Sequence, residues 1–299
     1  MIQLDASRCT ACGLCSQVCP RRVLETALHD GALRTTIVEE RRALCLGCGQ
    51  CALVCRHQAL QVDGLAPEAY AELPPEPLDP AALLQLFARR RSVRRYRDQP
   101  VPREILTRIV EAVRYAPPAS GRPQVGVIVV DDPELLGRIS RGCYALYSRL
   151  GEGLRNPFAR FFIRRQIGAR VLGQLESFVL PAMRWYSRWY QNGEGDELRR
   201  DSPALLLFHA PRAEACSDES CLIAALYAVL MAETLGVGTL INGLVPPGCN
   251  KSPELRQLLQ LPPEREVYSC LCLGYPRIRY SRTLRRPLAE VRFLEPPGG

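Results

Sequence analysis

Eight of the fourteen cysteines in this 299-residue chain lie in two short runs that share one spacing. The runs consist of Cys9, Cys12, Cys15, Cys19 and of Cys45, Cys48, Cys51, Cys55. Both follow the pattern C-x2-C-x2-C-x3-C, which is typical of thiolates that hold 4Fe-4S clusters. Zinc sites more often use two C-x2-C pairs separated by a dozen or more residues, and a third cysteine in each run would have no role there. The spacing therefore predicts two 4Fe-4S clusters.

The two runs belong to an internal repeat, because seven of sixteen positions are identical when residues 9–24 are superposed on residues 45–60. With this spacing, three thiolates of one run surround a cluster and the fourth reaches the other cluster. The predicted ligand sets are Cys9, Cys12, Cys15 and Cys55 for one cluster, and Cys45, Cys48, Cys51 and Cys19 for the other. Pro20 follows the first run, whereas Arg56 follows the second. This difference can change the potential or the solvent exposure of one cluster.

Residues 1 to about 65 resemble a bacterial two-cluster ferredoxin. The resemblance implies a small domain of short strands around the clusters, and the pair Asp30-Gly31 predicts the turn of a hairpin. A ferredoxin only carries electrons, so the remaining chain must determine where they go.

A basic run, RRRSVRRYR, extends from Arg89 to Arg97. Arginine forks with a serine hydroxyl suit a bound phosphate monoester, so a clamp for a cofactor phosphate is one interpretation and a solvated basic face is another. Nucleic-acid binding is disfavoured, because Tyr96 is the only aromatic residue in the run and no helix-turn-helix or zinc-finger pattern adjoins it. The run alone leaves the first two interpretations open.

Length and composition predict two globular domains. The chain exceeds the usual size of one domain, and its 47% hydrophobic and 23% charged residues are typical of soluble globular proteins. The proline-rich stretch between Gly64 and Pro80 predicts a semi-rigid linker, which divides the chain into residues 1–65, a linker at 66–79 and a second domain at 80–299. The N-terminus lacks a signal pattern and no apolar window could span a bilayer, so we expect a cytoplasmic protein without a transmembrane segment.

The second domain begins with a helix signal, in which Asp79 is the N-cap and Pro80 the first helical residue. Apolar residues at helical spacing predict an amphipathic helix that contains Ile105, Leu106, Ile109, Val110 and Val113. Strands are predicted for VGVIVVDD, SPALLLFHAP and VYSCLCLGYP, and a buried helix for the stretch from Glu219 that ends at a glycine turn near LGVGT.

This order of elements resembles the FMN-dependent nitroreductase family over residues of about 80 to 290, and the fused ferredoxin resembles its iron–sulfur subgroup. The motifs that carry the resemblance are R-x-S-x-R at Arg90, Ser92 and Arg94, the A-P loop at 116–124 and LGVGT at 235–239. The resemblance implies an α+β fold: a ferredoxin-type domain, and an α/β FMN-binding domain whose central, mostly antiparallel sheet is flanked by helices.

The resemblance also implies which residues contact FMN. Arg90, Ser92 and Arg94 are expected at the flavin phosphate and ring edge, the backbone around Asn242 and Gly243 at the ring, and Arg282 or Arg285 at the phosphate. In the A-P loop the family has Asn and then Gln before Pro, whereas this chain reads Gly121, Arg122, Pro123, Gln124. Gln124 is therefore the candidate contact from this loop.

The predicted function is an oxidoreductase in which two 4Fe-4S clusters pass electrons to FMN, and FMN reduces a small unsaturated electrophile such as a nitroaromatic, a quinone or an activated alkene. No G-x-G-x-x-G occurs, which favours the fused ferredoxin as the electron source, although family members can take hydride from NAD(P)H. An external ferredoxin or flavodoxin is a further possible donor. The alternatives are an electron-transfer subunit that relays to a protein partner and an FMN-dependent dehydrogenase. Because the chemistry is centred on the flavin, no catalytic side chain is predicted.

The region from 135 to 200 carries an apolar stripe at helical spacing among many arginines, including Phe161, Phe162, Leu172 and Phe178. We interpret it first as a core or dimer contact, and next as a lid over the flavin pocket or a membrane-facing surface. By resemblance the family forms homodimers with flavin sites at the interface. The six remaining cysteines are expected to be inert thiols, the three histidines are not expected to act in acid–base chemistry, and the tail after Arg286 is expected to be extended and to wrap a partner subunit.

Overall fold

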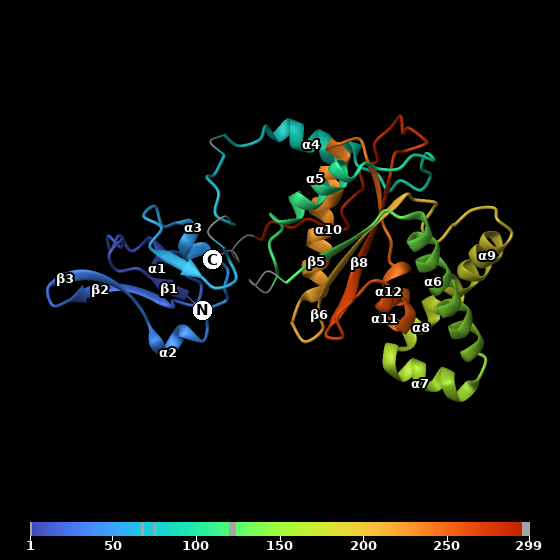
Figure 1. Cartoon of the computed structure of the whole chain (residues 1–299), viewed down its shortest axis with the longest axis horizontal. Helices are drawn as coiled ribbons and strands as arrows, with labels where there is room; N and C mark the ends of the chain where they lie inside the picture. The colour runs from blue at the N-terminus through green and yellow to red at the C-terminus, as the bar shows by residue number, and fades with distance from the viewer. Residues whose placement is uncertain (1, 67–68, 75, 120–123, 295–299) are drawn as a thin grey trace.

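The computed structural model describes residues 2–66, 69–74, 76–119 and 124–294 (Figure 1). A small N-terminal domain and a larger second domain are connected by the proline-rich segment. Gly121, Arg122 and Pro123 of the predicted A-P loop lie outside the described residues, as does the end of the tail from residue 295.

The N-terminal domain contains two antiparallel strand pairs and three short helices. β1 (Ile2–Leu4) pairs with β4 (Leu60–Val62), and β2 (Leu24–His29) pairs with β3 (Ala32–Ile37). Asp30 and Gly31 have φ angles of 50° and 79°, as a two-residue hairpin turn requires, so the predicted hairpin is confirmed. The helices are α1 (Leu14–Val18), α2 (Glu39–Arg42) and α3 (Gln50–Leu53).

A four-stranded antiparallel sheet forms the centre of the second domain. Its order is β5-β6-β8-β7, with β5 at Gly126–Val130, β6 at Ala204–Pro211, β7 at Gly238–Ile241 and β8 at Arg265–Gly274. β5, β6 and β8 correspond to the three predicted strands. β7 was not predicted, because a four-residue strand that begins at a glycine carries little sequence signal and is held by its pairing with β8.

The helices of the second domain have these bounds: α4 Pro80–Arg89, α5 Arg103–Val113, α6 Pro133–Gly153, α7 Pro157–Ile167, α8 Ala169–Gln174, the π-helical turn η2 Leu175–Val179, α9 Leu180–Gln191, α10 Ser217–Thr234, α11 Val245–Lys251 and α12 Pro253–Leu258. α4 begins as predicted, since the Asp79 carboxylate accepts a hydrogen bond from Ala81 N–H at 3.1 Å.

Both faces of the sheet are buried. Leu206 and Phe208 of β6 pack in one hydrophobic core with α5 and α10, whereas Leu205 and Leu207 pack in a second core with α6, α9 and α11. This alternation explains why β6 and β8 are nearly continuous apolar runs in the sequence. The predicted fold class, an α+β arrangement with helices on both sides of an antiparallel sheet, is confirmed.

The apolar stripe between 135 and 200 divides into two parts. Leu172 is buried in the core, whereas Phe161, Phe162 and Phe178 are 62%, 63% and 76% exposed. A core position was therefore wrong for these three phenylalanines within one chain, because α7 and the η2 turn contact α8 and α9 through other residues and leave these rings exposed. A dimer contact stays a prediction. None of the helices in the described part of the chain has the length and apolar character needed to cross a bilayer.

Candidate functional site

The structure gathers four thiols around a cavity of about 250 Å³ in the N-terminal domain. They belong to Cys9, Cys12, Cys15 and Cys55, which is the first of the two predicted ligand sets. Three come from the first repeat and one from the second. Arg56 and His57 also line this cavity.

A second and narrower cavity, of about 20 Å³, is lined by the other predicted set. Its thiols belong to Cys19, Cys45, Cys48 and Cys51, and Pro20 lies beside them. Each cavity thus takes three cysteines from one repeat and the last cysteine of the other, as the spacing rule for paired 4Fe-4S clusters requires.

Local backbone geometry orients the thiols. α1 and α3 each follow a glycine in the left-handed conformation, Gly13 and Gly49. Backbone N–H groups donate hydrogen bonds to the sulfurs of Cys9, Cys19 and Cys55 at 3.3–3.4 Å. Such bonds favour a sulfur that carries negative charge, so they suit thiolate ligands.

The buried thiols need a metal to lose their protons. Burial raises the pKa of Cys51 to about 12 and also raises the pKa of Cys15. In the described residues no three His, Cys, Asp or Glu side chains are placed to hold a single metal ion. A zinc ion would need its sulfurs within about 2.3 Å of one point, whereas the spacing of the eight thiols follows the pattern of paired 4Fe-4S clusters.

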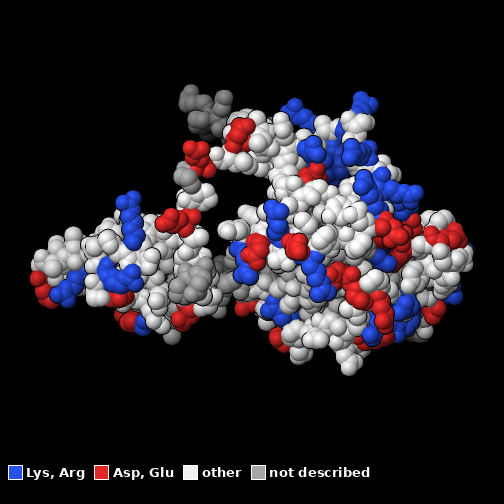
Figure 2. Space-filling model, turned by 45° about the horizontal axis from the view of Figure 1, so that its top comes forward, with Lys and Arg blue, Asp and Glu red and all other residues white. Residues whose placement is uncertain are grey.

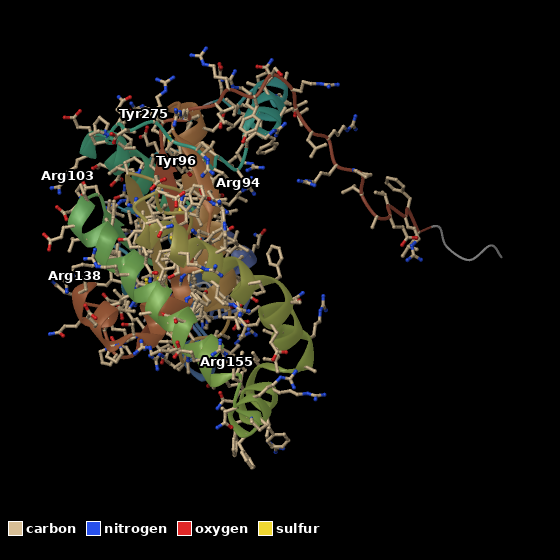
Figure 3. All side chains as sticks on the ribbon, turned by 90° about the vertical axis from the view of Figure 1, so that its right-hand side faces the viewer. Arg94, Tyr96, Arg103, Arg138, Arg155 and Tyr275 are labelled. Atoms are coloured by element: carbon tan, nitrogen blue, oxygen red, sulfur yellow. The ribbon has the colours of Figure 1, made fainter. Side chains whose placement is uncertain are left out.

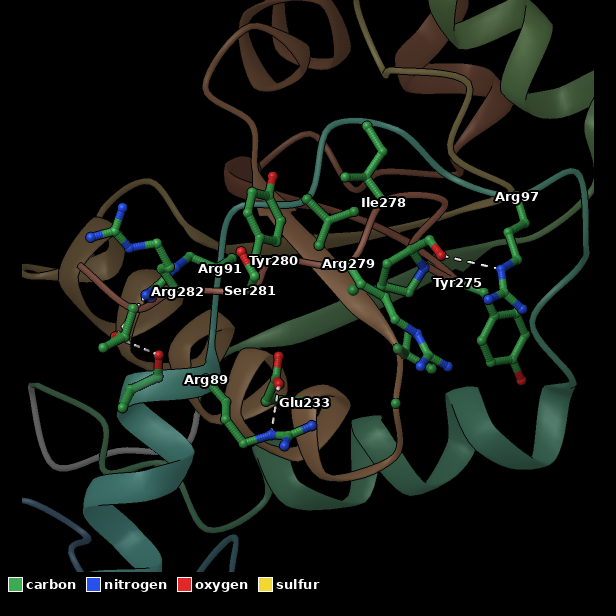
Figure 4. A pocket seen from close by; sticks show the side chains of 17 residues that line it. Arg89, Arg91, Arg97, Glu233, Tyr275, Ile278, Arg279, Tyr280, Ser281 and Arg282 are labelled. Atoms are coloured by element: carbon green, nitrogen blue, oxygen red, sulfur yellow. Dashed lines mark hydrogen bonds and ion pairs between the residues drawn. The ribbon is translucent and has the colours of Figure 1, made fainter.

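The second domain contains a cavity of about 720 Å³, which lies in the size range of small-molecule sites (Figure 4). Three segments that are far apart in the sequence form it: 88–93 with Arg97, 233–238, and 275–283. Five arginines line it, namely Arg89, Arg91, Arg97, Arg279 and Arg282.

The cavity is strongly positive, because Glu233 is the only carboxylate among the described residues that line it. Glu233 lies 3.7 Å from Arg89, and burial raises its pKa despite the opposing effect of the nearby arginines. Arg279 and Arg282 make no hydrogen bond or ion pair with any described residue. Their guanidinium groups are therefore available to an anionic ligand such as a phosphate.

Hydrogen bonds connect the segments around the cavity. Arg91 Nη2 donates to Thr283 Oγ1 at 2.7 Å, and Val93 N–H donates to Thr239 O at 2.8 Å. The approach of Val93 to β7 requires the glycine at its start, because a Cβ on Gly238 would lie 2.6 Å from a Val93 methyl carbon. The R-x-S-x-R segment thus lies along the free edge of β7, where Ser92 bridges to Thr239.

The predicted phosphate contacts lie at or near this cavity to different degrees. Arg282 lines it, and Arg90 and Ser92 flank the lining residue Arg91 and are partly buried. Arg94 is exposed between the bridges of Ser92 to Thr239 and of Tyr96 to Pro276, and Arg285 is exposed on the tail. Figure 2 shows arginine side chains gathered along the upper part of the second domain.

Asn242 and Gly243 follow directly on β7. The Asn242 side chain is buried and already paired, since its Nδ2 donates to Leu198 O at 2.7 Å and its Oδ1 accepts from Leu244 N–H at 2.9 Å. Gly243 is exposed, and a Cβ there would meet only open space. Asn242 therefore shapes the turn, and the backbone at Gly243 is open to a ligand.

Gln124 is the one predicted contact that the chain does not bring to this place. It lies just before β5, at the opposite edge of the sheet from β7. Its carbonyl accepts a hydrogen bond from Arg265, which also donates to His209 Nδ1 at 2.7 Å. Burial and the Arg265 charge lower the pKa of His209 to about 4, so this histidine is a neutral acceptor.

Sequence reasoning missed Arg91 and Arg279. Arg91 occupies an unspecified position of the R-x-S-x-R pattern, which names only Arg90, Ser92 and Arg94. The orientation of its side chain depends on the hydrogen bond to Thr283. Arg279 gave no signal beyond its place among the arginines that follow β8. The six other cysteines agree with the expectation of inert thiols in that all except Cys216 are buried.

Comparison with known proteins finds a family model that matches each part of the chain. The model of the nitroreductase family matches residues 87–275, and that of a 4Fe-4S dicluster domain matches residues 8–60. The chain is 30% identical over 213 residues to the "FMN reductase [NAD(P)H]" of Bacillus subtilis (strain 168), a match that covers 69% of this chain and 70% of the relative. It is 26% identical over 204 residues to a "NADH dehydrogenase" of Thermus thermophilus, covering 68% of this chain and 91% of the relative.

A solved structure has the same fold as the second domain. The crystal structure of a nitroreductase with bound FMN from Bacteroides fragilis superposes with a TM-score of 0.52 at 19% identity. The superposition covers 71% of this chain and 98% of that protein.

Proposed function

The chain belongs to the nitroreductase family and carries an N-terminal 4Fe-4S dicluster domain, and from this premise we propose a specific function for this oxidoreductase. When bound, two 4Fe-4S clusters would supply single electrons, and FMN would deliver them in pairs to a small nitroaromatic, quinone or activated alkene. The observation that carries the proposal is the presence, in one chain, of two cavities with four thiols each and of a cavity with five arginines.

The arginine cavity fits the phosphate of FMN. The guanidinium groups of Arg279 and Arg282 have no partner in the part of the chain that the structure describes, and Thr283 holds Arg91 at the same cavity. The ring would extend past Ser92 and Arg94 toward the backbone around Asn242 and Gly243, where Asn242 N–H is bonded to Cys270 O and Gly243 offers backbone polar groups without a side chain. Arg90 and Arg285 would add positive charge at the phosphate end.

A homodimer is part of the proposal. Gln124 is separated from the edge of β7 by the full width of the sheet within its own chain. A contact between Gln124 and FMN therefore requires the loop of a second copy. Sedimentation is expected to give a molar mass of twice the 33.4 kDa of one chain. A monomer with full FMN content would refute this role of Gln124.

The names of the two relatives favour NAD(P)H as one electron donor, and the fused dicluster domain favours a ferredoxin or flavodoxin as another. Turnover of the anaerobic holoenzyme with each donor distinguishes them. Steady reduction of a nitroaromatic, a quinone or an enone supports the reductase. Reoxidation by a protein acceptor alone would support an electron-transfer subunit, and net oxidation of an organic substrate would support a dehydrogenase.

Two variants test the FMN site directly, and a third is their control. Arg91→Ala and Arg282→Ala are expected to weaken FMN binding roughly 10- to 100-fold each, the effect of one lost charge-assisted hydrogen bond. Arg103→Ala is the matched control, because Arg103 is 84% exposed, pairs with Asp131 and lies on α5 away from Arg94 (Figure 3). FMN affinity is measured by flavin fluorescence titration. Equal weakening in all three variants, or a purified chain that binds no flavin, would contradict the proposal.

A further inference from the structure

Leu65 and Tyr70 pack on the loop that carries ligands of the second thiol cavity. After β4 the chain turns back, with Leu65 N–H donating to Val62 O at 3.1 Å and Ala69 N–H donating to Ala66 O at 2.9 Å. These turns bring Leu65 and Tyr70 onto Gly49, in the loop between Cys48 and Cys51. The first residues of the proline-rich segment therefore belong structurally to the N-terminal domain.

The contact with Gly49 is close. A Cβ on Gly49 would stand 2.8 Å from Leu65 Cδ1 and 3.8 Å from the Tyr70 hydroxyl oxygen. Gly49 has no side chain and a φ of +76°, so the phenol can reach the loop that carries the ligands of the second cavity.

The Tyr70 hydroxyl is buried and has no hydrogen-bond partner among the described residues. The loop at Gly49 carries two predicted ligands, Cys48 one residue before it and Cys51 two residues after it. A buried hydroxyl without a partner is unfavourable, and a metal-bound thiolate is a strong acceptor. The hydroxyl is thus a spare donor beside the loop whose cysteine sulfurs would gain negative charge when a cluster binds.

We propose that Tyr70 donates a hydrogen bond to the sulfur of Cys51, or to the cluster that Cys51 helps to hold, and thereby raises the reduction potential of that cluster. The physical reason is charge. One-electron reduction adds a negative charge to the cluster, and a hydrogen-bond donor favours the more negative form. The inference rests on the second cluster of the proposed function. Tyr70 acts on the potential of that cluster and is not a catalytic residue.

At the corresponding place the first repeat has no phenol, and besides Thr26 the group near Gly13 is the exposed Gln17 amide, whose Nε2 would lie 3.9 Å from a Cβ on Gly13. A Cβ on Gly13 would meet the Cβ and Oγ1 of Thr26 at 3.8 Å, and the Thr26 hydroxyl already shares a hydrogen bond of 2.9 Å with Thr35. The effect of Tyr70 is therefore confined to one of two otherwise related clusters, and the other cluster is an internal reference.

The test is an anaerobic redox titration of the full, cluster-loaded chain, followed by electron paramagnetic resonance, with and without Tyr70→Phe. Phenylalanine keeps the ring on Gly49 and removes only the hydroxyl. We expect one of the two one-electron waves to move to lower potential, with the equilibrium constant for its reduction falling about tenfold, which corresponds to about 59 mV. The other wave should not move.

Thr26→Val is the matched control, since it removes a hydroxyl that is already paired in the first repeat, and it is expected to leave the wave that responds to Tyr70 in place. A second readout is the shift of the Fe–S(Cys) Raman bands in heavy water, which should be smaller in Tyr70→Phe. About eight irons per chain with both waves unmoved by Tyr70→Phe would overturn this proposal alone. About four irons per chain in the unaltered protein would overturn the two-cluster function and this proposal with it.

Discussion

The two thiol cavities derive from one repeat, yet they differ in size and surroundings. The first is about 250 Å³ and is bordered by Arg56 and His57, whereas the second is about 20 Å³ and is bordered by Pro20 and Arg21. Leu65 and Tyr70 cover the ligand loop of the second cavity only. The ligand pattern was duplicated while the cover was not, so two equal sets of thiols are expected to hold clusters with unequal potentials.

The largest expected effect tests which thiols belong together. Cys19→Ser and Cys55→Ser change equivalent positions of the repeat, but Cys19 lines the second cavity and Cys55 the first. Each variant should retain about four of eight irons per chain. The cluster that remains in Cys55→Ser should respond to Tyr70→Phe, and the one that remains in Cys19→Ser should not. The reverse pattern would mean that each run of four cysteines serves its own cluster.

A smaller effect tests the cover itself. Gly13→Ala and Gly49→Ala both place a side chain at a left-handed φ, which costs about 1–2 kcal/mol. Only at Gly49 does the new methyl group meet an atom closer than 3 Å, the Cδ1 of Leu65. Gly49→Ala should therefore lower the midpoint temperature of cluster bleaching more than Gly13→Ala does. Equal losses would show that the cover contributes nothing to stability.

The smallest effect concerns Arg56, which lines the first cavity as Arg21 lines the second. Arg56 lines the first cavity but is exposed, so solvent and salt screen its charge. Arg56→Ala should lower the potential of the first cluster by on the order of 10 mV at low ionic strength, and by less at high ionic strength. A redox titration at two salt concentrations measures this. A shift in the wave that responds to Tyr70 would contradict the placement of Arg56.

Local signals predicted several elements of the second domain well. Asp79 and Pro80 predicted the start of α4, and the apolar periodicity around Ile109 predicted α5. β6 and β8 were visible because both of their faces are buried and their sequences are apolar throughout. β7 was missed, since its identity as a strand comes from pairing with β8 and with Ser92 rather than from its own four residues.

The candidate FMN residues show the same limit of local information. The R-x-S-x-R run predicted the segment that adjoins the arginine cavity, but Arg91, which lines it, is directed there by Thr283, 192 positions further along the chain. Gln124 was grouped with Asn242 because the family resemblance groups them, whereas the antiparallel order of the sheet places them at opposite edges. Phe161 and Phe178 were interpreted as core residues because periodicity identifies the apolar face of a helix but not whether another element packs on that face.

The sequence by itself determined the two groups of cluster ligands, because cysteines within eleven residues of one another are held together by the covalent chain and their spacing alone limits what they can surround. Tertiary structure decided the rest. The arginine cavity needs three distant segments to meet, and the phenol of Tyr70 reaches its place only because the chain turns back over Gly49. Such contacts depend on packing between distant residues, which no short stretch of sequence encodes.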